Sequence, residues 1–256
     1  MTLLDIIDIR GTGHPFLLLH GGAGPRSVLP FAEHLATTRP ARVLTPTIPG
    51  YNGSPRPDGL DTIAGLASTW LDLLEEEDLR DVAVVGNSIG GWTAAEMLTH
   101  PRATGRISSA VLLNAVGILT PEHPIRDVSG LTLPQIAEFS YAEPERFRID
   151  PASLPPQQQA QMKTNAETLA QYAGTPYMHD PTLRARLAAV TTPVHVIWGA
   201  ADRIVTAGYG RAYAAAIPGA AFTQLDGAGH LPQMEQPDTT RDLVWDWADA
   251  HAVARP

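Results

Sequence analysis

The chain has 256 residues, 44% of them hydrophobic, which suits one large α/β domain with or without an inserted subdomain. Its 18 basic and 27 acidic side chains give a formal net charge of −9, which argues against a broad surface for nucleic acid or anionic membrane. Because there is no cysteine, a disulfide, a thiol nucleophile and a Cys-ligated zinc site are excluded.

Short strands and helices alternate in the first part of the chain. The run Phe-Leu-Leu-Leu at 16–19 is apolar throughout, which is typical of a strand buried on both faces. The apolar residues within 60–77 follow helical spacing. In chain order we expect a strand at 3–10, a strand at 16–19, a helix at 28–37, a strand at 42–45, a helix at 60–77 and a strand at 82–85.

The strand at 82–85 runs into the motif Gly-Asn-Ser-Ile-Gly at 86–90, and a helix-compatible run follows at once. A strand, a tight turn and a helix in this order form the context that a nucleophile elbow requires. The bend strains the backbone at its apex, and glycines on either side avoid clashes where strand and helix pass closely. Ser88 is therefore the candidate nucleophile; the alternative is a serine that caps its own helix.

After a buried strand at 110–114, the strand rhythm stops from residue 116 to about 191. Short amphipathic segments at 133–139, 155–172 and 180–189 replace it, separated by Pro and Gly. We interpret residues 117–189 as a helical cap inserted over the strand ends, where it would form a lid or a substrate pocket. Residues 1–116 and 190–256 would then form the core.

The rhythm resumes at residue 194. We expect a strand at 194–198, a helix at 207–216, a strand at 221–225 and a helix from 237 to about 252. Alternating helices and apolar strands predict an α/β fold with a mostly parallel sheet and helices on both of its faces. Ligand sites of such sheets lie at the carboxyl ends of the strands.

Three polar features besides Ser88 follow predicted strands. The loop His20-Gly21-Gly22 is one, and its backbone N–H groups could form half of an oxyanion hole or simply turn the chain into a helix. Asp202 and His230 are the others, each in a Gly-rich loop. The order Ser, Asp, His is that of α/β-hydrolase triads.

Each member of this set has a chemical task. A histidine, which titrates near pH 6.5, can take the serine proton and later return it to the leaving group. An aspartate holds the imidazole in one tautomer and stabilises its charged form. The alternatives are that Asp202 caps a helix or pairs with Arg203, and that His230 is an ordinary loop histidine. Asp226 is the reserve acid.

The chain resembles the α/β-hydrolase superfamily over essentially its whole length. The motifs that carry the resemblance are the loops at 20–22, 49–54, 86–91, 198–202 and 229–230. By position, the resemblance implies that Ser88 is the nucleophile, His230 the base and Asp202 the acid. It places the oxyanion hole at the backbone N–H groups of Gly22 and Ile89, and it also implies a helical cap.

We expect a serine hydrolase of small carboxylic esters or lactones. The Gly-Asn-Ser-x-Gly-Gly elbow is similar to carbon–carbon bond hydrolases of ring-cleavage products, but Leu231 stands where those enzymes commonly have tryptophan. Prolyl aminopeptidases share the His-Gly-Gly loop, usually with proline where this chain has Ala23. A ligand-binding or receptor-like protein on the hydrolase scaffold is the third alternative.

The expected substrate contacts are Gly21, Asn87, Trp92, Phe139 and Leu231, and four further aromatic side chains could line the pocket, namely Tyr141, Phe147, Tyr172 and Tyr177. The remaining histidines show no ligand spacing, so we expect neither a metal nor another cofactor. The expected partner is a small-molecule substrate, not nucleic acid or membrane, and the oligomeric state stays open. No apolar run approaches the ~20 residues of a membrane span, and the N-terminal residues are acidic where a signal peptide is basic, which predicts a soluble, cytoplasmic protein.

Overall fold

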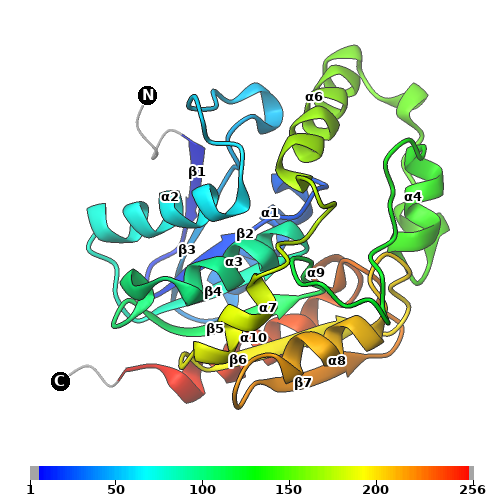
Figure 1. The fold of residues 1–256 in the computed structure, drawn as a ribbon. Coiled ribbons are helices and arrows are strands. Elements are labelled where there is room, and N and C mark those ends of the chain that lie inside the picture. The colour runs from blue at the N-terminus through cyan, green and yellow to red at the C-terminus, as the bar shows by residue number, and fades with distance from the viewer. Residues whose placement is uncertain (1–5, 254–256) are drawn as a thin grey trace.

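The computed structural model of the chain describes residues 6–253, and its centre is a seven-stranded sheet with the order β1-β3-β2-β4-β5-β6-β7 (Figure 1). β1 runs antiparallel to β3, and the other neighbours pair in parallel. The strands are β1 (Ile7–Arg10), β2 (His14–Leu19), β3 (Ala41–Pro46), β4 (Val82–Asn87), β5 (Ile107–Leu113), β6 (Val194–Gly199) and β7 (Ala221–Leu225). The strand predicted at 3–10 is β1 in its described part, and residues 3–5 lie outside the described residues.

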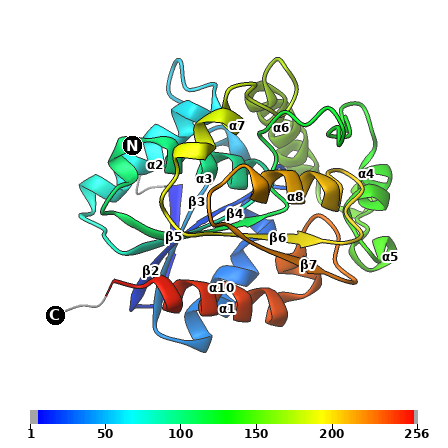
Figure 2. The same cartoon turned by 60° about the horizontal axis from the view of Figure 1, so that its bottom comes forward.

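Helices cover both faces of the sheet (Figure 2). α1 (Leu29–Thr38) and α10 (Pro237–His251) lie on one face, and α2 (Ile63–Glu76), α3 (Ile89–Thr99) and α8 (Ala207–Ala215) lie on the other. Side chains of a strand alternate between the two cores, so that Phe16 and Leu18 face one and Leu17 and Leu19 the other. This double burial explains the uninterrupted apolar runs and confirms the predicted fold class.

The predicted helices exist, with corrected boundaries. The helix predicted at 60–77 starts later, because the Thr62 hydroxyl caps α2 by accepting a hydrogen bond from Gly65 N at 3.0 Å. The amphipathic segment at 180–189 forms a single turn, α7 (Leu183–Arg186), followed by a 3-10 turn. A further turn, α9 (Pro232–Glu235), precedes α10 and was not predicted.

Between β5 and β6 the chain forms α4 (Leu133–Ser140), α5 (Pro144–Phe147), α6 (Pro156–Ala173) and α7. α4 and α6 stand to one side of the sheet in the view of Figure 1. Side chains from both helices line the same cavity as Ser88, so they cover the carboxyl ends of the strands. The exact division into a core and a cap at 117–189 stays a prediction.

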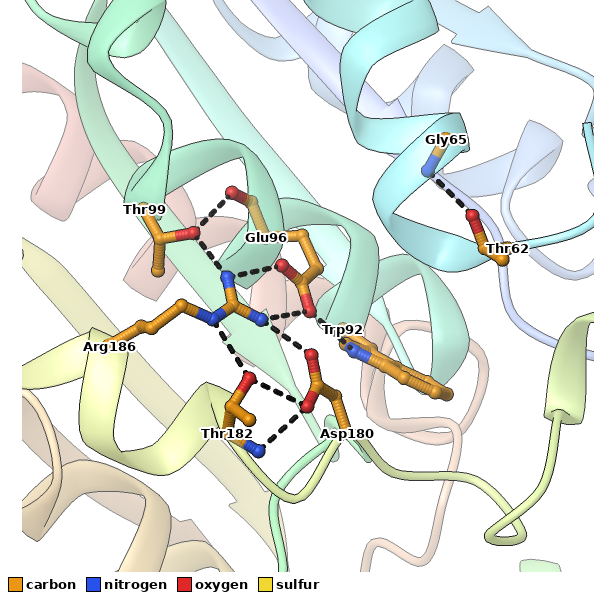
Figure 3. A network of polar contacts seen from close by, with 8 residues as sticks. All are labelled: Thr62, Gly65, Trp92, Glu96, Thr99, Asp180, Thr182 and Arg186. Carbon is orange, nitrogen blue, oxygen red and sulfur yellow. Dashed lines mark hydrogen bonds and ion pairs between the residues drawn. The ribbon is translucent and has the colours of Figure 1, made fainter.

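A polar network fastens the end of this segment to α3 (Figure 3). Arg186 of α7 binds both carboxylate oxygens of Glu96, at 2.7 and 2.9 Å, and also binds Asp180 at 2.7 Å. Glu96 is only 5% exposed, and its second partner is the indole N–H of Trp92 at 3.2 Å. Because Asp180 N also donates to Gly117 O, the network holds the two ends of the inserted segment together against α3.

Candidate active site

Ser88 lies at the apex of a strained turn between β4 and α3. Its φ of 56° and ψ of −118° fall outside the regions that a non-glycine residue prefers. A Cβ on Gly86 would lie 2.3 Å from Gly90 O, and a Cβ on Gly90 would lie 2.3 Å from Leu19 O, so both positions require glycine. The Ser88 side chain makes no capping hydrogen bond to its helix, which removes support from the capping alternative.

Asp202 and His230 meet at the same sheet edge. His230 Nδ1 lies 2.7 Å from Asp202 Oδ2, and Asp202 is only 3% exposed. Since a carboxylate only accepts, Nδ1 carries the proton, and Nε2 keeps the lone pair that a base needs. Asp226, the reserve acid, is exposed on a turn, and the Arg203 guanidinium binds backbone oxygens instead of Asp202.

Asn114 is a buried partner of this pair that the sequence analysis did not identify. Its Nδ2 donates to Asp202 Oδ2 at 2.7 Å, and its Oδ1 accepts from Gly199 N at 3.2 Å. The other carboxylate oxygen of Asp202 accepts from the backbone N–H groups of Ile204 and Val205. The available signal was an asparagine just past the end of β5, where its φ of 45° suits asparagine better than most residues.

The backbone of the His230 loop is held from two sides. Asn87 Nδ2 donates to His230 O at 2.9 Å, and His230 N donates to Ser140 O at 2.5 Å. Glu235 accepts from Gly229 N and from Ala142 N, both at 2.7 Å. The histidine is therefore fixed both to β4 and to the turn that ends α4.

Burial raises the pKa of Glu235, and its backbone hydrogen bonds oppose that shift. Within the described residues, the hydrogen-bond donors to this carboxylate are backbone amides, those of Ala142, Gly229 and Leu231. Glu235 therefore acts as an acceptor that joins the loop of His230 to the end of α4. The sequence analysis did not identify this residue.

The loop at 20–22 lies directly against the elbow. A Cβ on Gly21 would be 2.9 Å from Ser88 Cβ, and a Cβ on Gly22 would be 2.8 Å from Leu169 Cδ2 of α6. His20 is fully buried: its Nδ1 donates to Gly21 O at 2.8 Å, and its Nε2 accepts from Ile48 N at 3.0 Å. Burial lowers the pKa of His20 to about 4, so it stays neutral and holds the loop.

A cavity of about 290 Å³ opens above the serine. Five of the ten residues predicted for the triad, the oxyanion hole and the substrate contacts line it, namely Gly22, Asn87, Ser88, His230 and Leu231. Its walls are mainly apolar and come largely from α4, α6 and the loops next to them, with Leu133, Ile136, Met162, Leu169 and Met178 among the side chains. The volume is close to the lower end for ligand pockets.

Three predicted substrate contacts lie elsewhere. Trp92 belongs to the network of Figure 3, and Phe139 packs beneath the guanidinium of Arg126, whose central carbon is 4.1 Å from the ring centre. Gly21 supports the elbow from below without lining the cavity. The side chains of Trp92 and Phe139 are directed away from the cavity by packing that the sequence does not display, and Gly21 has no side chain to present to it.

The four further aromatic residues divide in the same way. Tyr141, Phe147 and Tyr177 line the cavity, and the rings of Tyr141 and Phe147 are stacked with centroids 4.8 Å apart. Tyr172 is buried instead, with its hydroxyl bound to Pro49 O and Leu60 O. One wall of the cavity is therefore an aromatic pair.

Two findings concern possible cofactors and membranes. Within residues 6–253, no group of three or more His, Asp or Glu side chains is placed to hold a metal ion. No helix in the same part of the chain has the length and apolar character needed to cross a membrane.

A parallel sheet with a strained serine at a strand end, and a buried Asp–His pair beside it, defines the class of α/β hydrolases. The chain belongs to the alpha/beta hydrolase family, whose family model matches residues 16–243.

The relatives of the chain within this family differ in their chemistry. It is 28% identical over 255 residues to a pimeloyl-[acyl-carrier protein] methyl ester esterase of Aromatoleum aromaticum, covering 90% of this chain and 96% of that protein. It is 26% identical over 258 residues to 2-hydroxy-6-oxononadienedioate/2-hydroxy-6-oxononatrienedioate hydrolase 2 of Pseudomonas putida, covering 94% and 89%. An esterase structure from Thermogutta terrifontis matches with a TM-score of 0.70 and 24% identity, covering 96% and 93%.

Proposed function

We propose that the chain is a serine hydrolase that cleaves small carboxylic esters or lactones through an acyl-enzyme. The observation that carries the proposal is the 2.7 Å bond between His230 and the buried Asp202, at the same cavity as the strained Ser88. The similarity to a methyl ester esterase supports the ester as the substrate. We also propose that residues 117–189 act as the cap of this site.

The reaction would proceed in two halves. Ser88 Oγ attacks the carbonyl carbon while its proton passes to His230 Nε2, and the carbonyl π electrons move to the oxygen. Collapse of this tetrahedral intermediate breaks the bond to the alcohol, which takes the proton from His230. Water then repeats the sequence on the acyl-enzyme, giving its proton to His230 and releasing the acid and the free serine.

Backbone amides would stabilise the negative charge on the oxygen. Ile89 N lies at the first turn of α3, where the helix leaves its N–H groups without helical partners. Gly22 N lies in the loop that packs against the elbow. We assign the oxyanion hole to these two groups, because donors from two fixed segments can surround one oxygen.

The experiment is ester turnover beside labelling by a fluorophosphonate. Ser88→Ala should abolish labelling and lower kcat/KM for aryl esters by about three orders of magnitude or more. Ser68→Ala, on α2 and outside the cavity lining, is the matched control and should leave both unchanged. Turnover of esters by Ser88→Ala at the rate of the parent would refute the proposal. A folded parent protein that is not labelled by the fluorophosphonate and does not turn over esters would favour a binding protein.

Carbon–carbon bond hydrolysis is the second candidate, and the similarity to the Pseudomonas putida hydrolase favours it. The elbow asparagine that suggested this chemistry has a different task here, since both of its amide hydrogen bonds go to backbone oxygens, Leu113 O and His230 O. Turnover of a vinylogous diketone at a higher kcat/KM than any ester would make this the main activity. Ester turnover without dienol turnover would remove it.

A further inference from the structure

The cavity contains few polar groups that remain available to a ligand. The Asn87 side-chain amide donates to His230 O, and Ser140 Oγ donates to Ile136 O at 2.8 Å. Asn165 of α6 exchanges two hydrogen bonds with Asn52, at 2.7 and 3.1 Å. Apart from the reactive pair of Ser88 and His230, these three polar side chains of the walls therefore serve the protein more than the ligand.

Charge in the cavity has the opposite sign to that of the molecule. The chain has a net charge of −9, yet none of the described residues that line the cavity is Asp or Glu. Arg126 is the lining residue with a permanent charge. It is also exposed, so it lies at the rim of the cavity, where solvent and the apolar interior meet.

The Arg126 side chain is already held in place. Its Nε donates to Arg203 O at 3.0 Å, and its guanidinium carbon lies 4.1 Å from the centre of the Phe139 ring. Its backbone N donates to Ile204 O at 2.9 Å. Within residues 6–253 the two terminal NH₂ groups have no hydrogen-bond or ion-pair partner, so a planar fork of donors is oriented in advance.

We propose that Arg126 binds a carboxylate at the end of the substrate that is remote from the scissile ester, so that the substrate is a monoester of a dicarboxylic acid. This inference rests on the proposed ester hydrolysis at Ser88. A guanidinium and a carboxylate match in geometry and pair through two parallel N–H···O bonds. The apolar walls between Ser88 and the rim suit the methylene chain that joins the ester to the carboxylate.

The test compares two substrate series of equal chain length. One series consists of monomethyl esters of straight dicarboxylic acids from four to ten carbons, and the other of methyl esters of the corresponding monocarboxylic acids. Acid release gives kcat and KM for each. At one chain length the parent should prefer the dicarboxylate monoester, and added salt should reduce this preference because the rim is exposed.

Arg126→Gln removes the charge and keeps a polar side chain. We expect the ratio of kcat/KM between the two series to fall about tenfold, a modest effect for a charge-assisted pair because Arg126 is exposed. The loss of kcat/KM should appear mainly as a higher KM. The pair of Arg126 and the carboxylate lies away from the reacting carbonyl, so it stabilises the bound substrate and the transition state equally. Arg148→Gln is the matched control, because Arg148 is also an exposed cap arginine but does not line the cavity.

The outcomes separate this inference from the proposed function. Neutral esters turned over through Ser88 with no preference for the monoesters would overturn the carboxylate assignment and leave ester hydrolysis standing. An equal loss for both series in Arg126→Gln would also overturn it, since that points to a structural role. If neither series is turned over and Ser88 is not labelled, both proposals fail together.

Discussion

Acidification should weaken the fold through His20, the buried histidine beneath the candidate oxyanion loop. Its pKa is lowered by burial from an ordinary value of 6.5 to about 4. Below pH 6.5 the unfolded chain takes up a proton that the folded chain refuses, so the free energy of unfolding falls as the pH falls. The contribution is complete above pH 6.5 and is lost on the way down to about pH 4.

The expected size follows from the difference between the two pKa values. One pKa unit corresponds to about 1.4 kcal/mol, so the whole shift is worth roughly 3 kcal/mol, and about 2 kcal/mol of it is lost between pH 7.5 and pH 5. His195, whose pKa burial also lowers to about 4, acts in the same direction. A variant that removes only His20 should therefore flatten the pH dependence without abolishing it.

Urea unfolding followed by tryptophan fluorescence at several pH values between 7.5 and 5 measures this effect. His20→Gln keeps an acceptor for Ile48 N and cannot titrate. It should be less stable than the parent at pH 7.5, yet lose about 2 kcal/mol less on going to pH 5. His251→Gln, at the end of α10, is the control. An unchanged slope in His20→Gln would refute the reasoning.

Three further substitutions test the contacts around the site. Arg186→Met leaves the buried carboxylate of Glu96 without its cation and should lower the free energy of unfolding by about 3 kcal/mol in urea titrations. Asn114→Ala deprives Asp202 of a donor and Gly199 N of its acceptor, so kcat should fall about tenfold and stability by about 2 kcal/mol. Gly22→Ala places a Cβ 2.8 Å from Leu169 Cδ2 and should lower kcat/KM by about tenfold through overpacking.

Second substitutions in the same protein distinguish these specific effects from a general loss of stability. Adding Glu96→Gln to Arg186→Met removes the stranded charge and should restore at least half of the lost stability, and no recovery would contradict the buried-charge account. Leu169→Ala should rescue part of the Gly22→Ala defect by making room for the new methyl group. If Asn114→Ala changed stability without changing kcat, Asn114 would support the sheet and not Asp202.

Sequence reasoning predicted best where local pattern and final geometry coincide. The strands were predicted because they are buried on both faces and therefore read as apolar runs. The sequence predicted Ser88, Asp202 and His230 at one edge of the sheet, because the end of a parallel strand fixes where a following residue lies. Asp202 and His230 indeed meet, and Ser88 lines the same cavity as His230.

The sequence did not predict the residues whose place depends on contacts between distant segments. Trp92 lies one helical turn after the elbow, but its indole N–H binds Glu96 of the same helix instead of facing the cavity. Arg186, from a distant segment, holds the Glu96 carboxylate in place. Phe139 was placed outside by the turn that ends α4 and by Arg126. No periodicity along the chain encodes the pairing of Arg186 with Glu96 or of Arg126 with Phe139, which arises only when distant segments pack together.

The junction between the inserted segment and the reactive loops is made largely of main-chain oxygens. Ser140 O accepts a hydrogen bond from His230 N. Phe139 O accepts one from the backbone N of Arg203, the residue that follows Asp202. A carbonyl oxygen is the same for every amino acid, so the side chains of α4 are free to mutate while the turn keeps its shape. New substrate preferences can therefore arise by exchanging Leu133 or Ile136, with the distance between acid and base left as it was.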